Sequence, residues 1–182
     1  MNNLISYYKT QPMVRATRHS KGKDVFRGSR LGDLVIMALI ANQRQRGELF
    51  NLNNQAGKVL VLDFWSTGCS ICFKKFPEFD KLKQKYTSQS EIEFYAVNLI
   101  YPKEQMSSLK KVIDSFSYSF KTLYTDQNSV KQIRELLKID AVPTIVVIDK
   151  KGMVVYSGAL YIEKFVFIDN IYNIIESAKN NE

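Results

Sequence analysis

The stretch that decides the fold is Val59-Leu60-Val61-Leu62-Asp63-Phe64-Trp65-Ser66-Thr67-Gly68-Cys69-Ser70-Ile71-Cys72. Its first four residues are apolar and rich in β-branched side chains, and two aromatic residues follow Asp63, which predicts a fully buried strand. Gly68 interrupts this pattern. Beyond it the apolar residues are spaced three or four apart, as on one face of a helix: Cys72, Phe76, Phe79, Leu82 and Tyr86. The two cysteines therefore fall where a central strand turns into a helix.

This position of the cysteines favours redox chemistry. Cys69 falls at the expected helix start, where unpaired backbone N–H groups and the helix dipole stabilise a thiolate. Two cysteines can also be ordinary buried apolar residues, but a Cys-x-x-Cys motif beside a strand–helix unit is a redox signature. A structural zinc site needs about four ligands. Because His19 is the single histidine, no metal site is expected.

Other hydrophobic patterns predict the rest of the sheet. Strands are expected over residues 92–99, 121–124, 144–149 and 153–157, and helices over 106–116, 130–137 and 165–175. Upstream, Leu34–Ala41 is predicted to lead through Asn42–Gly47 into a second strand over Glu48–Leu52, as a hairpin. Strands that alternate with helices and end in a hairpin and a helix predict an α/β fold with a mixed sheet.

Several motifs resemble the thioredoxin superfamily. Asp63-Phe64-Trp65 followed by Cys69 and Cys72 looks like its active-site strand and loop. Pro77 matches the proline that kinks its active-site helix, and Ala141-Val142-Pro143-Thr144 is similar to its cis-proline loop. The resemblance implies a thioredoxin-like fold, with a central mixed sheet flanked by helices.

Within the superfamily, the TlpA/ResA-like branch fits best. Its members carry an N-terminal β-hairpin extension ending in Gly-Lys, here Gly57-Lys58, and an extra segment between the active-site helix and the proline loop. The resemblance covers roughly residues 45–180. Gly68 departs from the family, which usually has tryptophan there, and this opens the rim of the site. Lys75 replaces a glutamate of ResA-like proteins and is expected to favour the thiolate electrostatically.

The resemblance and the chemistry of thiols assign roles to the candidate site residues. Cys69 is expected to attack as a thiolate, and Cys72, deeper in the helix, to resolve the mixed disulfide. Asp63 resembles the buried carboxylate that assists proton transfer at the inner cysteine, and a carboxyl buried without a partner should have a raised pKa. A structural acid with a partner is the alternative for Asp63. Substrate binding is expected at Trp65, Gly68, Val142 and Pro143, where the loop backbone is free to pair with an extended peptide.

The net charge of +8 is unevenly distributed along the 182 residues. Residues 1–47 hold nine basic and two acidic residues, which gives +7, whereas residues 48–182 hold 17 and 16, which gives +1. We therefore expect a basic arm over residues 1–30 and a thioredoxin-like domain over 31–182. A solvated arm is favoured over one that contacts a membrane surface, and no nucleic acid partner is expected.

These observations predict a monomeric thiol-disulfide oxidoreductase that needs no cofactor. It is expected to reduce protein disulfides rather than form them, and to be recharged by an upstream thiol reductant. The family resemblance implies a periplasmic or otherwise extracytoplasmic location, but no export signal is visible and no apolar run approaches the roughly 20 residues of a membrane span. A cytoplasmic location is therefore the alternative.

Two other function classes remain open. A peroxidase of the peroxiredoxin kind uses a Pro-x-x-x-Thr-x-x-Cys setting, whereas Thr67 lies only two residues before Cys69 and no proline precedes it nearby. A non-catalytic thioredoxin-like binding protein would not need Asp63, Trp65, both cysteines and Pro143 together.

Overall fold

The computed structural model describes residues 44–45, 48–50, 55, 57–99, 106–125, 127–137, 139–159 and 164–180. The basic arm and the strand predicted over Leu34–Ala41 lie outside these residues. The strands are β1 (Arg44–Gln45), β2 (Glu48–Leu49), β3 (Val59–Trp65), β4 (Ile92–Asn98), β5 (Lys121–Tyr124), β6 (Thr144–Ile148) and β7 (Val154–Ala159). The helices are α3 (Ser70–Gln84), α4 (Met106–Asp114), α5 (Gln127–Leu137) and α6 (Lys164–Lys179).

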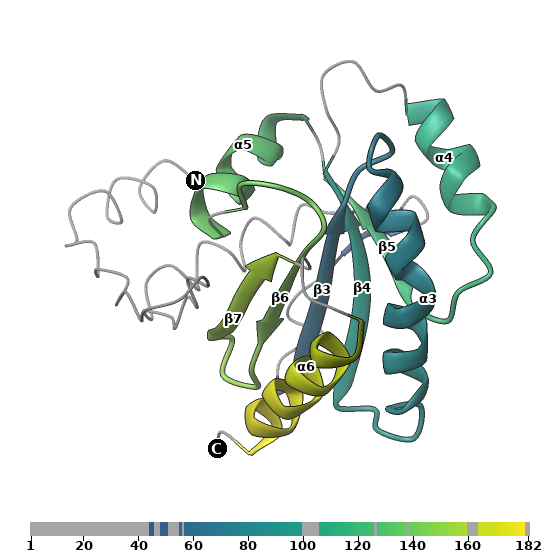
Figure 1. The fold of residues 1–182 in the computed structure, drawn as a ribbon. Coiled ribbons are helices and arrows are strands. Elements are labelled where there is room, and N and C mark those ends of the chain that lie inside the picture. The colour runs from purple at the N-terminus through teal and green to yellow at the C-terminus, as the bar shows by residue number, and fades with distance from the viewer. Residues whose placement is uncertain are drawn as a thin grey trace, which may run out of the picture.

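The seven strands form one sheet in the order β2-β1-β5-β4-β3-β6-β7. β3, β4 and β5 run parallel to one another, whereas β6 pairs antiparallel with β3, and β7 with β6. The predicted mixed sheet is therefore confirmed, and β3 lies in its interior, between β4 and β6 (Figure 1). Every residue of β3 is buried, as its unbroken apolar run predicts.

Helices cover both faces of the sheet. Successive side chains of a strand point to opposite faces, and we call the side that carries Val61, Asp63 and Trp65 the α3 face. α3 and α6 cover it, with Phe76 of α3 and Ile171 of α6 in its apolar cluster. α5 covers the opposite face, where its buried residues Val130, Ile133 and Leu137 pack against Leu60, Leu62 and Phe64 of β3. The core is thus two apolar layers divided by the sheet.

The described residues include a short hairpin before β3, formed by β1 and β2. Arg44 pairs with Leu49 and Gln45 with Glu48, so β1 falls in the segment expected to be a turn. β1 also pairs antiparallel with β5, which joins the hairpin to the edge of the sheet. The local sequence of β1 is polar and does not alternate, so the pairing with β5 rather than a hydrophobic pattern accounts for this strand.

Candidate active site

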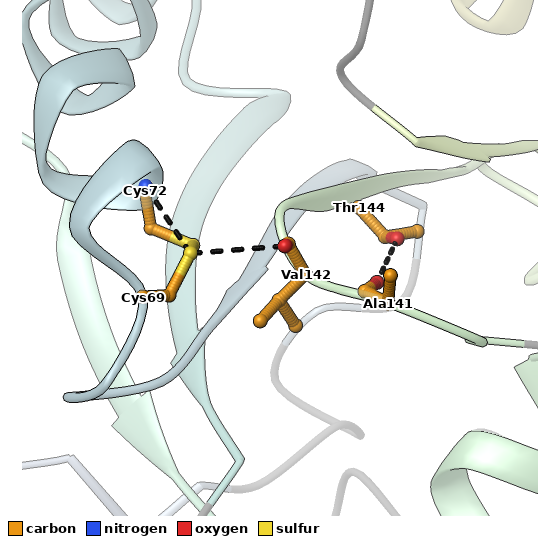
Figure 2. The surroundings of a disulfide bond; sticks show 5 residues. All are labelled: Cys69, Cys72, Ala141, Val142 and Thr144. Carbon is orange, nitrogen blue, oxygen red and sulfur yellow. Dashed lines mark hydrogen bonds between the residues drawn. A yellow bond between two sulfur atoms is a disulfide. The ribbon is translucent and has the colours of Figure 1, made fainter.

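The two cysteines are joined by a disulfide at the start of α3. The two sulfurs are 2.07 Å apart and the two Cα atoms 5.3 Å apart (Figure 2). β3 ends at Trp65, a turn follows, and Cys69 becomes the N-cap residue of α3. Its sulfur accepts a hydrogen bond from the backbone N–H of Cys72 at 3.2 Å. This sulfur therefore occupies the acceptor position that a capping oxygen fills in other helices, where negative charge is stabilised.

The two sulfurs differ in how easily a partner can reach them. Cys69 is 9% exposed, whereas Cys72 is fully buried. Around Cys69 the surface is open, because Gly68 and Ser70 are exposed and Ile71 presents 44% of its area to solvent. The geometry therefore makes Cys69 the sulfur that a second protein can approach.

The loop before β6 faces the cysteine pair. The Val142–Pro143 peptide bond is cis, and the Val142 carbonyl oxygen lies 3.7 Å from the Cys69 sulfur (Figure 2). Thr144 fixes this loop, since its hydroxyl donates a hydrogen bond to the Ala141 carbonyl at 2.7 Å. Pro143 is buried and Val142 is half-buried. The structure thus brings together Cys69, Val142 and Pro143, which are more than 70 residues apart along the chain.

Asp63 is fully buried in β3, two residues before Trp65. In the part of the chain that the structure describes, neither of its carboxylate oxygens has a hydrogen-bond partner. Its neighbours in the adjacent strands are Ala96 of β4 and Ile145 of β6, both of them apolar. Burial raises the pKa of the Asp63 carboxyl well above its usual value, because the charged form loses its hydration. Among the described residues, Asp63 is thus a buried acid without a hydrogen-bond partner, and a carboxyl with a raised pKa is suited to general acid–base chemistry.

Trp65 and Gly68 differ in what they offer a substrate. Trp65 is completely buried, and its indole packs against the rings of Phe73, Phe76 and Phe116, with centroids 5.4–5.6 Å apart. A direct contact between Trp65 and a substrate does not fit this position, so Trp65 supports the site from beneath. Gly68 is exposed, and a Cβ atom added there would meet nothing within 4 Å. The rim at Gly68 is therefore open, as the sequence predicts.

Lys75 does not act as a free positive charge. Its ammonium group forms an ion pair with Glu78 at 3.1 Å, one helical turn along α3, and both side chains are mostly buried. The negative charge of Glu78 offsets that of Lys75, so the expected electrostatic support for the thiolate is weaker than predicted. The signal was present in the sequence, since an acidic residue three positions after a lysine on a helix is an ordinary ion-pair spacing.

Asn98, at the end of β4, is a buried polar residue that was not predicted from the sequence. Its side chain is fully buried beside Trp65, its partner in the strand register, and both of its amide atoms lack hydrogen-bond partners among the described residues. A polar residue that ends an otherwise apolar strand was the available signal. Within the described ranges, no three His, Cys, Asp or Glu side chains gather as metal ligands would. No helix there is long and apolar enough to span a bilayer.

Comparisons with known proteins agree with this arrangement. Residues 28–171 match the Redoxin family. The thiol-disulfide oxidoreductase ResA of Geobacillus kaustophilus is 30% identical over 127 residues, 70% of this chain and 66% of that protein. The thioredoxin-like protein YneN of Bacillus subtilis is 26% identical over 108 residues, 59% of this chain and 60% of that protein. The chain therefore spans a little less than two thirds of the length of these relatives.

Solved structures show the same fold. A thiol:disulfide interchange protein from Bacteroides sp. has a TM-score of 0.59 at 22% identity, over 79% of this chain and 92% of that chain. The pneumococcal exposed lipoprotein thioredoxin of Streptococcus pneumoniae has a TM-score of 0.58 at 18% identity, over 86% and 99%. These matches confirm the thioredoxin-like fold and the resemblance to ResA-like proteins. Because the family match covers most of its length, the chain belongs to the Redoxin family.

Proposed function

We propose that this protein is a thiol-disulfide oxidoreductase that reduces protein disulfides through Cys69 and Cys72. One observation carries the proposal: the reachable sulfur of Cys69 caps α3 and lies 3.7 Å from the carbonyl of a cis-proline loop. A purely structural disulfide would not need an open rim beside it. Relatives that bear the name thiol-disulfide oxidoreductase support the same activity.

The reaction begins from the reduced dithiol. The Cys69 thiolate attacks one sulfur of a substrate disulfide, a new S–S bond forms, and the first substrate sulfur leaves as a thiolate. Cys72 then attacks Cys69, which closes the internal disulfide and releases the second substrate sulfur. Two electrons pass to the substrate, and the Cys72 proton must be removed during the second step. An upstream thiol reductant restores the dithiol.

Asp63 is the proposed base of that second step. It lies on the same face of β3 as the core residues that pack beneath Cys72, and its raised pKa brings its proton exchange closer to neutral pH. With Asp63→Asn, thiol–disulfide exchange should slow while the fold is retained. Unchanged exchange rates between pH 6 and pH 9 would make Asp63 a structural residue.

The proposed substrate is an extended segment of another protein. Gly68 and Ile71 form an open, partly apolar rim beside Cys69, and the Val142 backbone can pair with a passing strand. Pro143, the next residue of the loop, is buried and is joined to Val142 by the cis peptide bond. We further propose that the protein acts as a monomer outside the cytoplasm, with residues 1–30 as a solvated arm and residues 31–182 as the catalytic domain.

A trapping experiment tests the activity. With Cys72→Ser, Cys69 should still attack a substrate, but no neighbouring thiol could resolve the mixed disulfide. Partner proteins should then accumulate as complexes that a reductant releases, and a Cys69→Ser control should capture none. If the trap captures no partner while the wild-type protein consumes hydrogen peroxide at an enzymatic rate, a thiol peroxidase replaces this proposal.

The reduction potential of the Cys69–Cys72 pair tests the direction of electron flow. A reductant should lie near the value of thioredoxin, about −270 mV, and an oxidant near that of DsbA, about −120 mV. We expect a value close to the first.

A further inference from the structure

Three neighbouring residues leave buried polar atoms without partners. They are Asp63, Trp65 and Asn98, which we call the orphan cluster. Eight buried side-chain nitrogen and oxygen atoms lack a hydrogen-bond partner in the described part of the chain, and five of them belong to this cluster. Those five are both carboxylate oxygens of Asp63, the indole nitrogen of Trp65 and both amide atoms of Asn98. Such atoms are rare in folded proteins, so five in one place call for a common explanation.

The register of the sheet places the cluster next to the cysteines. Trp65 of β3 lies opposite Asn98 of β4, and Asp63 lies opposite Ala96, two residues earlier. Residues two apart on a strand share a face, so all three side chains are on the α3 face. β3 and β4 are parallel, so their carboxyl ends lie side by side. Asn98 ends β4 next to Trp65, the residue after which the chain turns toward Cys69. The cluster thus lies at the active-site end of the sheet.

Among the described residues, no charged group acts on Asp63. Burial alone raises the pKa of its carboxyl, without a contribution from a neighbouring charge. In the strands on either side of β3, the residues in register with Asp63 are the apolar Ala96 and Ile145. Farther out on the α3 face, β5 and β7 carry the phenols of Tyr124 and Tyr156, and α3 places Cys72 in the same cluster of the core.

The three side chains have complementary hydrogen-bonding capacity. An indole N–H only donates, an amide both donates and accepts, and a carboxyl group accepts when ionised and can donate when protonated. A buried water typically makes about three hydrogen bonds to polar groups that have no other partner. We propose that Asn98 and the Trp65 indole hold an ordered water against Asp63, and that Asn98 is a positioning residue for proton transfer between Asp63 and Cys72. This inference rests on the proposed function.

The proton balance of the resolving step defines what the water does. Cys72 begins as a thiol, and its sulfur forms a bond to Cys69 while the bond between Cys69 and the substrate breaks. The substrate leaves with the electron pair of that bond as a thiolate. The Cys72 proton passes to the Asp63 carboxylate. From there it passes through the water held by Asn98 toward the carboxyl ends of β3 and β4. Without this water the ionised carboxyl would be unsolvated and the proton would lack an exit.

Two variants at Asn98 separate polarity from packing. Asn98→Leu keeps a side chain of similar size but removes both amide groups, whereas Asn98→Ser keeps a polar group and leaves room for water. Ser157→Ala serves as the matched control, because it removes a buried hydrogen bond to the Leu137 carbonyl in another part of the sheet. The full chain is used throughout, in the disulfide form for titration and in the dithiol form for kinetics.

The first readout is the titration of Asp63, followed by NMR of its labelled carboxyl carbon and assigned with Asp63→Asn. Water solvates the charged form, so its loss in Asn98→Leu should move the titration midpoint upward by about one pH unit. Asn98→Ser and Ser157→Ala should stay near the wild-type midpoint. If Asn98→Leu does not fold, Trp65→Phe removes the indole N–H and should shift the midpoint in the same direction. An unchanged midpoint in the folded variant would overturn the proposal.

The second readout is stopped-flow reaction of the dithiol with an aromatic disulfide whose thiolate absorbs light. Release of the first aromatic thiolate reports attack by Cys69 on the disulfide. Release of the second aromatic thiolate reports resolution of the mixed disulfide by Cys72. In Asn98→Leu the release of the second aromatic thiolate should slow about tenfold, and its pH profile should move upward. This is less than the roughly 10²–10⁴-fold contribution of a complete acid–base group, because Asp63 itself is retained. The first release should stay within about twofold, since Asn98 does not act on Cys69. Equal slowing of both releases would contradict a role in proton transfer.

The two readouts also separate this inference from the proposed function. If the wild-type dithiol gives neither release, the oxidoreductase activity fails. The titration of Asp63 needs no turnover, so it still decides whether Asn98 controls hydration of the carboxyl.

Discussion

Replacing Asp63 by asparagine should change how the stability of the protein depends on pH. Burial raises the pKa of Asp63 in the folded state, whereas an unfolded aspartate titrates near pH 3.9. Between these two values the folded protein keeps a proton that the unfolded chain releases. Rising pH therefore favours unfolding, and the stabilising effect of the protonated carboxyl, complete below the unfolded pKa, is lost as pH rises through the folded pKa.

The size of this effect follows from proton linkage. In the window between the two pKa values, the free energy of unfolding of the wild type should fall by about 1.4 kcal/mol per pH unit relative to Asp63→Asn. The difference should be constant below about pH 3. It should level off again above the folded pKa.

Urea denaturation of the disulfide form, repeated from pH 3 to pH 8, measures this difference. The disulfide form is used because a free Cys72 thiol would titrate together with Asp63. Asp114→Asn is the matched control, since Asp114 is an exposed aspartate at the end of α4. A wild-type and Asp63→Asn pair whose free energies of unfolding differ by the same amount at every pH would refute the reasoning, because it would mean that folding leaves the pKa of the carboxyl unchanged.

Three further predictions follow from burial and position. In the reduced protein, limiting iodoacetamide should label Cys69 before Cys72, because Cys69 is reachable and its sulfur caps α3; mass mapping that finds Cys72 labelled first would reverse their roles. Trp65→Ala should cost about 3–5 kcal/mol of unfolding free energy, as for other buried aromatic residues, and a loss under 1 kcal/mol in urea titration would contradict its packing. Deleting residues 1–30 should leave insulin reduction largely intact, since the candidate site lies beyond them; loss of activity in a folded variant would give the arm a part in the site.

Much of the fold was predictable because its signals are local. The apolar run from Val59 to Leu62 needs no partner to identify it as a buried strand, and Gly68 marks where it ends. β5 is predicted with the same bounds as observed, Lys121–Tyr124. α5 begins at Gln127, three residues before its first apolar position, because the first turn of a helix is commonly polar and carries no periodic signal.

Long-range contacts explain what the sequence did not predict. β1 exists through its pairing with β5, which lies far away along the chain. Trp65 was expected at the substrate surface, but the rings of Phe73, Phe76 and Phe116 enclose it, and the last of these belongs to the segment after α4. In the sequence, Asn98 is an ordinary polar residue at the end of a strand. In the structure, the strand register places it beside Trp65. Local motifs therefore identify the two cysteines, whereas the residues that surround them are determined by contacts between distant segments.

The direction of electron flow follows from how the Cys69 thiolate is stabilised. A dithiol whose thiolate is strongly stabilised is easily formed, so its disulfide is a strong oxidant, as in DsbA. Here the support comes from the Cys72 N–H and the start of α3. The residues between the cysteines are Ser70 and Ile71, neither of which carries a charge, and the charge of Lys75 is offset by Glu78. Because this support comes mainly from the backbone, we expect the thiolate to be stabilised modestly and the dithiol to act as a reductant rather than an oxidant.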